Sequence, residues 1–309
     1  MSYLKPFDPW RATSLCTCPF KYTVNPYTGC AHGCLYCYAS SYIRRFFEPR
    51  PKADFIKVVA RDLRRVPESS IINISSSSDP YGPLEAEYGY TRSLLELITG
   101  KYIVEIVTKS DLVVRDADLL AGGPSVVSIT ITTLDKTLAA RLEPRAPSPE
   151  RRLGAVEKLS ERGIPVVVRL DPLLPGLNDS PEVVREVLEA VAAAGAQHVV
   201  SSTYKAKLDS LRRLSEAFPD MIPRLRDAYI EGGRRIHGYM YAPESSRYRL
   251  MKMVRENAHK YGLTFSPCRE GFRDLIDRGV SCDGTHLALK KASASRGTQP
   301  SRRSGIGTA

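Results

Sequence analysis

Three cysteines lie within eight residues of the chain, a spacing that suits joint metal ligation. Cys30, Cys34 and Cys37 form a C-x3-C-x2-C pattern inside the stretch NPYTGCAHGCLYCYAS. Thiolates are ligands of iron–sulfur clusters, and a loop this short can bring three of them to one four-iron cube while the fourth iron stays free of protein. The spacing therefore predicts a [4Fe-4S] cluster with an open iron. A zinc site fits less well, because zinc usually takes two separated pairs of ligands and His32 lies too close in sequence.

The elements around this loop must bring other side chains to the cluster. Strand-like stretches alternate with helical stretches through most of the chain, which predicts parallel strands joined by crossover helices. Six such units are fewer than the eight of a closed barrel, so we expect an α/β fold: a partial, TIM-like (β/α)6 barrel with a helical C-terminal extension. The expected strands lie at residues 21–24, 71–75, 102–108, 126–132, 165–170 and 198–202.

Residues 126–132 illustrate how such a strand faces a polar lumen. Ser128, Thr130 and Thr132 alternate with apolar residues, as expected when one face looks into the barrel and the other meets helices. Ligands of parallel barrels gather at the carboxyl ends of the strands. We therefore expect the cofactor in this lumen, with Thr130 and Thr132 among the residues that bind it.

Charged residues at other expected strand ends are candidates for binding the substrate. A barrel lumen also uses Lys–Asp and Arg–Asp pairs to neutralise its own buried charges, so each candidate has a structural alternative. Glu143 and Arg145, in the stretch LEPRAP, equally fit a role in capping or bracing the helix that follows. The substrate candidates are Asp79, Lys109, Arg169 and Asp171.

The cysteine loop, with Tyr36 just before its third cysteine, resembles that of the radical S-adenosylmethionine (SAM) superfamily over residues 20 to about 202. The runs SSSSDPYGPLE, VTKSDLVVRD, LEPRAPSPERRL and DPLLPGLND are similar to the spore photoproduct lyase-like branch, which includes archaeal DNA repair photolyase-like proteins. The resemblance implies an enzyme that reductively cleaves SAM at its [4Fe-4S] cluster to form a 5′-deoxyadenosyl radical. It implies catalytic roles for the three cysteines, a place for Tyr36 beside the adenine and a contact of Ser78 with SAM. It also implies an electron donor such as ferredoxin or flavodoxin.

One position departs from the lyase pattern. Ser76 stands where the lyase carries the cysteine that returns a hydrogen atom to the product radical. A serine O–H bond is too strong to replace a thiol in that step. The sequence therefore argues against thymine-dimer repair by the usual route of this branch, and a tyrosine such as Tyr38 or Tyr81 is an alternative donor.

Four further cysteines lie in two groups far apart in the sequence. Cys16 and Cys18 form a C-x-C pair before the first expected strand, whereas Cys268 and Cys282 lie near the other end of the chain. Both ends of a barrel chain can meet, so these four thiolates could complete a second iron–sulfur cluster or a zinc site, with His286 as an alternative fourth ligand. Buried cysteines that behave as small apolar side chains are the other interpretation.

The chain is basic, with 45 Lys and Arg against 34 Asp and Glu, a formal net charge of +11 and a pI near 9.3. This charge favours nucleic acid as a partner, because cations that neutralise phosphates release condensed counterions, although an Arg-rich solvated surface has the same composition. No apolar run approaches the length of a membrane span. Seven cysteines, three of them at ligand spacing, fit a reducing compartment. We therefore expect a cytoplasmic protein without a membrane partner.

One main domain should account for most of the 309 residues. The final stretch, KKASASRGTQPSRRSGIGTA, has almost no apolar side chains to bury, which predicts disorder. The expected division is an N-terminal extension with the cysteine pair at 1–19, the barrel at 20–205, a helical extension that completes the domain at 206–289, and a disordered basic tail at 290–309.

Three functions are compatible with these features. The first is a radical SAM enzyme that modifies or repairs a nucleic acid. The second keeps the radical chemistry but gives it a small-molecule or peptide substrate, with the extra cysteines holding an auxiliary cluster. The third is a noncatalytic iron–sulfur protein that binds nucleic acid or transfers electrons.

Overall fold

A mainly parallel, eight-stranded sheet forms the centre of the computed structural model, which describes residues 1–7 and 15–297. The strand order is β1-β2-β5-β6-β7-β8-β9-β12. Within this sheet, β2, β5, β6, β7, β8, β9 and β12 pair in parallel, and β1 pairs antiparallel at the edge beside β2. The strands are β1 (Lys5–Phe7), β2 (Lys21–Val24), β5 (Ile71–Ile74), β6 (Ile103–Thr108), β7 (Ser125–Thr130), β8 (Val166–Leu173), β9 (His198–Thr203) and β12 (Thr264–Pro267).

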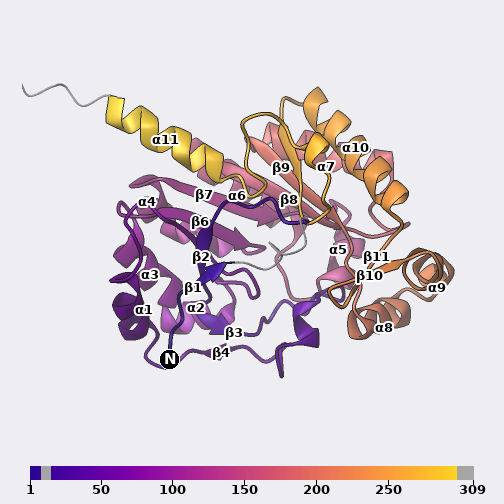
Figure 1. Ribbon diagram of the computed structural model, residues 1–309, viewed down its shortest axis with the longest axis horizontal. Helices are drawn as coiled ribbons and strands as arrows, with labels where there is room; N and C mark the ends of the chain where they lie inside the picture. Colours follow the sequence, from indigo (N-terminus) through magenta and orange to yellow (C-terminus); the bar gives the residue numbers. More distant parts are fainter. Residues whose placement is uncertain (8–14, 298–309) are drawn as a thin grey trace, which may run out of the picture.

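Helices cover the outside of the curved sheet, as expected for a partial (β/α)6 barrel (Figure 1). All six predicted strands are present, so the predicted fold class is confirmed. No described helix is long and apolar enough to cross a membrane. The α-helices are α1 (Phe55–Leu63), α2 (Pro83–Tyr88), α3 (Tyr90–Ile98), α4 (Ala117–Ala121), α5 (Lys136–Leu142), α6 (Pro149–Glu161), α7 (Pro181–Ala193), α8 (Leu208–Ala217), α9 (Ile222–Arg226), α10 (Glu244–Lys260) and α11 (Thr285–Gly297).

Helix α7 shows how local sequence produces these outer helices. The Ser180 hydroxyl accepts the N–H of Val183, and Pro181 occupies the first turn, where its missing N–H does no harm. Val184, Val187, Leu188 and Val191 lie on one face and are buried in the core between sheet and helices. One apolar face is what a helix needs to pack against a sheet.

Shorter elements complete the chain. In the described residues, two small antiparallel sheets lie outside the main sheet, and a π-helical turn follows α9 directly. One pairs β3 (Tyr27–Thr28) with β4 (Arg50–Pro51) across the cysteine loop, and the other is a hairpin of β10 (Arg234–Ile236) and β11 (Tyr239–Tyr241). The 3-10 turns are η2 (Ala39–Ser41), η3 (Asp111–Asp116), η4 (Pro219–Met221) and η6 (Arg273–Leu275), and the π turn is η5 (Asp227–Glu231).

The C-terminal region differs from the helical extension expected at residues 206–289. Strand β12 extends the main sheet beside β9, and β10 and β11 form a hairpin, so this region is not purely helical. Strand β12 has only four residues, which is too short to show a clear hydrophobic period in the sequence. The barrel sheet therefore continues beyond residue 205.

The predicted tail also differs in its first part. Helix α11 continues to Gly297, although disorder was expected from Lys290, because a helix needs little apolar surface when its residues favour helical backbone. Residues 298–309 of the predicted tail, and 8–14 of the N-terminal extension, lie outside the described residues.

The amino-terminal end of the barrel lumen is filled by apolar side chains. Ile71, Ile103, Val126, Val167 and Val200 come from the first three residues of five neighbouring strands and form one buried cluster. Ala288 of α11 belongs to the same cluster, so α11 closes this end. Ligands must therefore enter from the carboxyl ends of the strands, where the cysteine loop lies.

Candidate active site

The cysteine loop follows β3 and is fixed by two glycines with left-handed backbone. Gly29 has φ +86°, and a Cβ there would lie 2.4 Å from the carbonyl oxygen of Phe46. The next N–H, of Cys30, donates to that same oxygen at 2.7 Å. Gly33 has φ +70° and lies against the guanidinium group of Arg145, 3.0 Å from where a Cβ would be. Glycine lets the loop turn this tightly because it has no side chain to clash.

The second half of the loop is held by the segment after β7. The N–H of Leu35 donates to the carbonyl of Leu142 at 2.9 Å, and the N–H of Arg145 donates to the carbonyl of His32 at 3.1 Å. The LEPRAP stretch therefore braces the cysteine loop through its backbone.

The three loop thiols have little access to water. Cys34 is buried, and Cys30 and Cys37 are partly buried. Burial, helped by the nearby Asp79 carboxylate, raises the pKa of Cys30 to about 12, and burial also raises the pKa of Cys34 and of Cys37. Free thiols in this loop therefore keep their protons at neutral pH. A metal must displace three protons to bind them, which couples cluster assembly to pH.

Lys109 supplies positive charge to these thiols. It follows β6, and its Nζ lies 5.5 Å from the centre of the Tyr36 ring and 4.0 Å from Oε1 of Glu143. Although burial opposes its charge, the Cys34 thiol and the Glu143 carboxylate raise the pKa of Lys109. The same ammonium group lowers the pKa of all three cysteines. Lys109 thus favours thiolate formation in the loop.

Glu143 connects the loop to the barrel wall and is completely buried. Its Oε1 accepts the hydroxyl groups of Tyr36 and, at 3.2 Å, of Thr132. Arg152 of α6 pairs with the other oxygen and also donates to the carbonyl of Thr130 at 3.1 Å. Although burial opposes ionisation, Arg152 and Lys109 lower the pKa of Glu143. The carboxylate is therefore charged and serves as a brace.

Asp79 supports the loop from the end of β5. Its Oδ2 lies 2.9 Å from Nε2 of His32, and it accepts the Thr108 hydroxyl at 2.7 Å and the Lys109 N–H at 2.7 Å. Although burial opposes ionisation, His32 and these donors lower the pKa of Asp79 to about 2. Its oxygens are already engaged within the protein. This favours the structural alternative for Asp79 over the predicted substrate role.

The serine run after β5 is organised by Asn25. The N–H of Ser77 and the hydroxyl of Ser78 approach the side-chain oxygen of Asn25, at 3.3 and 3.4 Å. The Ser76 hydroxyl instead lies 3.0 Å from the hydroxyl of Thr23. The predicted contact of Ser78 with SAM, like those of Tyr36, Thr130 and Thr132, remains a prediction.

The predicted pair Arg169 and Asp171 lies elsewhere in the lumen, on β8. The guanidinium group donates to the Asp171 carboxylate at 2.7 Å and approaches Sγ of Cys268 at 3.6 Å. Ser202 donates to the other oxygen of Asp171. These residues neutralise each other and lie beside Cys268, and Asp171 also lies close enough to Tyr38 to act on it electrostatically.

A cluster of aromatic and basic residues beside Cys37 was missed by the sequence analysis. The Arg269 guanidinium carbon lies 5.3 Å from the ring centre of Tyr38 and 5.0 Å from that of Tyr239. Nζ of Lys207 lies 4.0 Å from the Tyr239 ring centre, and the exposed Tyr42 adjoins Tyr38 with ring centres 6.4 Å apart. We call these five residues the aromatic–basic cluster. They come from distant segments of the chain, so no local sequence pattern shows that they meet.

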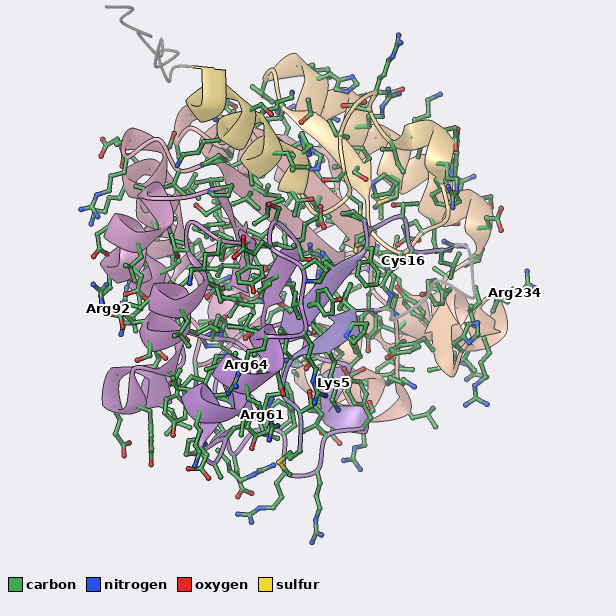
Figure 2. All side chains as sticks on the ribbon, turned by 60° about the vertical axis from the view of Figure 1, so that its left-hand side comes forward. Lys5, Cys16, Arg61, Arg64, Arg92 and Arg234 are labelled. Carbon is green, nitrogen blue, oxygen red and sulfur yellow. The ribbon has the colours of Figure 1, made fainter. Side chains whose placement is uncertain are left out.

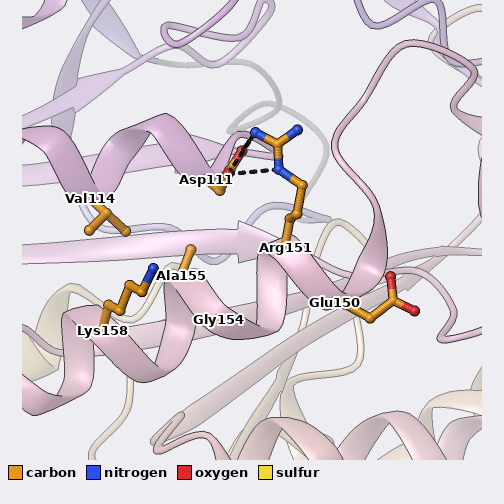
Figure 3. A pocket seen from close by; sticks show the side chains of 7 residues that line it. All are labelled: Asp111, Val114, Glu150, Arg151, Gly154, Ala155 and Lys158. Carbon is orange, nitrogen blue, oxygen red and sulfur yellow. Dashed lines mark hydrogen bonds and ion pairs between the residues drawn. The ribbon is translucent and has the colours of Figure 1, made fainter.

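A separate pocket lies on the outer face of the barrel between η3 and α6 (Figure 3). Arg151 makes two hydrogen bonds of 2.9 Å to the Asp111 carboxylate there. Lys158 and Glu150 also line it. None of the predicted site residues lines this pocket, so it is distinct from the lumen site.

The Radical SAM superfamily model matches residues 24–188, a region that contains all three loop cysteines. The chain belongs to the radical SAM superfamily. It is therefore a radical SAM enzyme, and the family implies a [4Fe-4S] cluster and SAM as cofactors. The site fits that cluster, since three thiols on one glycine-shaped loop form a soft donor set with a cation, Lys109, to favour their charged form.

Relatives occur in bacteria, archaea and phages. An uncharacterized protein of Mycobacterium tuberculosis H37Rv is 29% identical over 267 residues, covering 79% of this chain and 76% of the relative. An uncharacterized protein of Methanocaldococcus jannaschii is 33% identical over 187 residues, covering 59% and 70%. The Radical SAM Nalpha-GlyT isomerase of Pseudomonas phage M6 is 24% identical over 256 residues, covering 79% of this chain and 53% of the phage protein.

Solved structures show the same fold. Spore photoproduct lyase complexed with dinucleoside spore photoproduct is 17% identical, with a TM-score of 0.65 over 84% of this chain and 79% of the lyase. Streptococcus suis SuiB bound to S-adenosylmethionine is 16% identical, with a TM-score of 0.54 over 79% of this chain and 49% of SuiB.

Proposed function

We propose that this radical SAM enzyme acts on a nucleic acid, which it binds at the aromatic–basic cluster beside Cys37. The aromatic–basic cluster is the main support for this proposal, because it combines two kinds of contact that single-stranded nucleic acids use. Aromatic rings stack on bases, and Lys and Arg neutralise phosphates. The likeness to a lyase that binds a dinucleoside, and the net charge of +11, support the same substrate class.

The aromatic–basic cluster also lies beside the cysteine loop, where a substrate must bind to meet the radical. Lys207 follows β9 and Arg269 follows β12, at the carboxyl ends of those strands, and Tyr38 follows Cys37 directly in the cysteine loop. When bound, the [4Fe-4S] cluster and SAM supply a 5′-deoxyadenosyl radical. The protein's own residues hold the nucleotide beside the cysteine loop and exclude water. A base that reacts inside a barrel must leave its stack, which favours single-stranded or damaged sites.

Tyr38 is the better of the two predicted hydrogen donors. Burial raises its pKa to about 12, and it lies in the lumen mouth beside Cys37. Tyr81 instead packs in the core between sheet and helices, where a substrate has no access. Ser76, held by Thr23, cannot replace a thiol in this step.

Binding of a fluorescent single-stranded oligonucleotide tests the proposal. We expect Lys207→Ala and Tyr42→Ala to weaken binding several-fold, and Lys207→Ala to reduce the slope of log affinity against log salt by about 0.7 for its one phosphate contact. A matched control is Arg61→Ala/Arg64→Ala, on the outer helix α1 (Figure 2), which removes two cations without touching the cluster. A second control, Arg302→Ala/Arg303→Ala, removes tail charges. Both controls should keep the binding at the aromatic–basic cluster.

Activity provides a second measurement. Oligonucleotide should stimulate formation of 5′-deoxyadenosine, and Cys37→Ala should abolish that product while leaving oligonucleotide binding intact, because the thiolates act as a set. If the tail variant bound no nucleic acid at low salt and no oligonucleotide stimulated SAM cleavage, the substrate would instead be a small molecule or peptide. If SAM cleavage survived loss of the loop cysteines, the cluster assignment would be wrong.

A further inference from the structure

Four cysteines outside the active-site loop meet where the two ends of the barrel sheet approach each other. Cys16 and Cys18 precede β2, near one edge, while Cys268 directly follows β12, the opposite edge strand. Cys282 lies in the loop before α11. We call these residues the four-cysteine set. Figure 2 shows Cys16 where the N-terminal segment lies beside the C-terminal part of the chain.

Direct contacts hold these segments together. Sγ of Cys18 lies 3.0 Å from Sγ of Cys282, although 264 positions separate them. Beside them, Nζ of Lys21 lies 2.7 Å from the carboxylate of Asp283, and both side chains are buried. At the other side, Leu15 packs so closely on Gly271 that a Cβ there would lie 3.0 Å from its Cδ2.

The remaining two cysteines belong to the same group. Cys16 hydrogen-bonds Cys18, and Cys268 lies close enough to act electrostatically on Cys16, Cys18 and Cys282. All four are free thiols in the structure. The convergence expected from the sequence as one interpretation of these cysteines is therefore present in the fold.

Two largely buried cations lie next to the four-cysteine set. Nζ of Lys21, three residues after Cys18, pairs with the carboxylates of Glu105 and Asp283. The buried Arg169 directs a guanidinium nitrogen at Sγ of Cys268, 3.6 Å away. Both cations are already paired with carboxylates, Lys21 with Glu105 and Asp283 and Arg169 with Asp171, so their burial beside the sulfurs leaves no charge unpaired.

We propose that the four-cysteine set binds one zinc ion, which fastens the N-terminal segment to the loop before α11 across the open side of the barrel. Four thiolates are a standard ligand set for structural zinc, and Zn–S bonds of about 2.3 Å place tetrahedral sulfurs about 3.8 Å apart. Sγ of Cys18 and Sγ of Cys282, which lie 3.0 Å apart, would move apart by about 0.8 Å to reach this separation. A structural role follows from a closed, four-ligand shell, which leaves no position for substrate.

Packing favours a single ion over a four-iron cube. Gly284, two residues after Cys282, lies so close to β8 that a Cβ would be 2.2 Å from Cγ2 of Val167. Ala288 fills the lumen next to that valine. The alternative ligand His286 is engaged elsewhere, since its Nδ1 accepts the N–H of Ser281 and its ring packs on His198.

Zinc binding requires a small rearrangement. Among residues 1–7 and 15–297, no three His, Cys, Asp or Glu side chains already form a complete ligand set. Cys16 and Cys268 must therefore turn inward when the ion binds. Because the ligands come from distant parts of the chain, metal binding should contribute directly to folding stability.

The test uses the full chain with Cys30→Ala, Cys34→Ala and Cys37→Ala, which removes the active-site ligands and leaves four thiols. We expect about one zinc per chain by elemental analysis, little iron, and four thiols that resist a thiol reagent until a chelator removes zinc. Cobalt(II) in its place should show the strong sulfur-to-metal absorption of a tetrahedral thiolate site. Removing zinc should lower the melting temperature.

Two variants separate ligand loss from misfolding. Cys268→Ala/Cys282→Ala in this background should lose zinc, whereas Ser281→Ala, in the same loop, should keep it. If the ligand variant failed to fold, the zinc content and thiol protection of the parent protein would still decide. A metal-free parent, iron and sulfide in equal amounts, or a mass lower by two hydrogens, which marks a disulfide between Cys18 and Cys282, would each overturn the proposal.

Discussion

Nζ of Lys109 lies 4.0 Å from the buried carboxylate of Glu143. This contact joins a residue that follows β6 to one that follows α5, directly beneath the cysteine loop. The lysine lowers the pKa of the loop thiols, and the glutamate holds both Tyr36 and Arg152 in place. Charge at this contact therefore controls how readily the loop accepts metal.

Replacing the ammonium group should change the pH dependence of cluster assembly. Burial raises the pKa of the three thiols, and Lys109 opposes that rise. In Lys109→Ala the thiols should therefore hold their protons to higher pH, and the midpoint of iron loading should move to higher pH. Iron content measured across a series of reconstitution pH values checks this. Lys109→Arg keeps the charge and should load nearly as the parent does; an unchanged midpoint in the alanine variant would contradict the role given to Lys109.

Asp79 should stabilise the fold at neutral pH and lose that effect in acid. Its pKa is about 2, below the ordinary value of 3.8, so its stabilisation is complete above about pH 4 and disappears as pH falls toward 2. Asp79→Asn should lower the free energy of unfolding of cluster-free protein by about 2 kcal/mol at pH 7. Urea denaturation at several pH values measures the difference, which should narrow below about pH 4. Asp220→Asn, at an exposed carboxylate in η4, is the control.

Sequence predicted the parts of this structure that depend on local pattern. The six barrel strands are continuous β-branched stretches, and Cys30, Cys34 and Cys37 are separated by only a few residues, so spacing alone revealed them. Strand β12 was missed because four residues give too little pattern. Helix α11 was missed beyond Lys290 because its composition is polar.

Contacts between distant residues could not be predicted in the same way. His32 was considered only as a zinc ligand too near the cysteines, whereas the fold places its ring against Asp79. Arg269 comes together with Tyr38 only because the ends of β12 and the cysteine loop share one end of the barrel. The position of Asp79 shortly after a buried strand was a sequence signal for its contact with His32. No local sequence pattern indicated the contact between Arg269 and Tyr38.

Arg152 should matter more than Glu143 when each is replaced alone. Arg152→Ala leaves the buried Glu143 carboxylate without its main partner, which costs about 3–5 kcal/mol in such pairs. Glu143→Gln keeps an acceptor for Tyr36 and Thr132 and should cost less. The double variant should recover part of the loss, because it removes the unpaired charge. Thermal unfolding of the cluster-free proteins measures all three; additive losses would show that the two residues act independently.

Gly29 should be essential for the cysteine loop in a way that other left-handed glycines are not. A Cβ at this position would lie 2.4 Å from the Phe46 carbonyl oxygen, to which the N–H of Cys30 donates. Gly29→Ala must therefore break that hydrogen bond and move the first cluster ligand. Gly100 is the matched control, since its φ is +82° but nothing lies within 4 Å of the added Cβ.

Gly100→Ala should cost about 1 kcal/mol of stability from backbone strain and leave iron loading intact. Gly29→Ala should lose most of its iron, and with it the formation of 5′-deoxyadenosine, because the Cys30 thiol no longer converges with Cys34 and Cys37. Iron content and melting temperature, measured together, distinguish the two effects. Equal loss of iron in both variants would mean that backbone strain alone, and not the close approach to Phe46, makes Gly29 necessary.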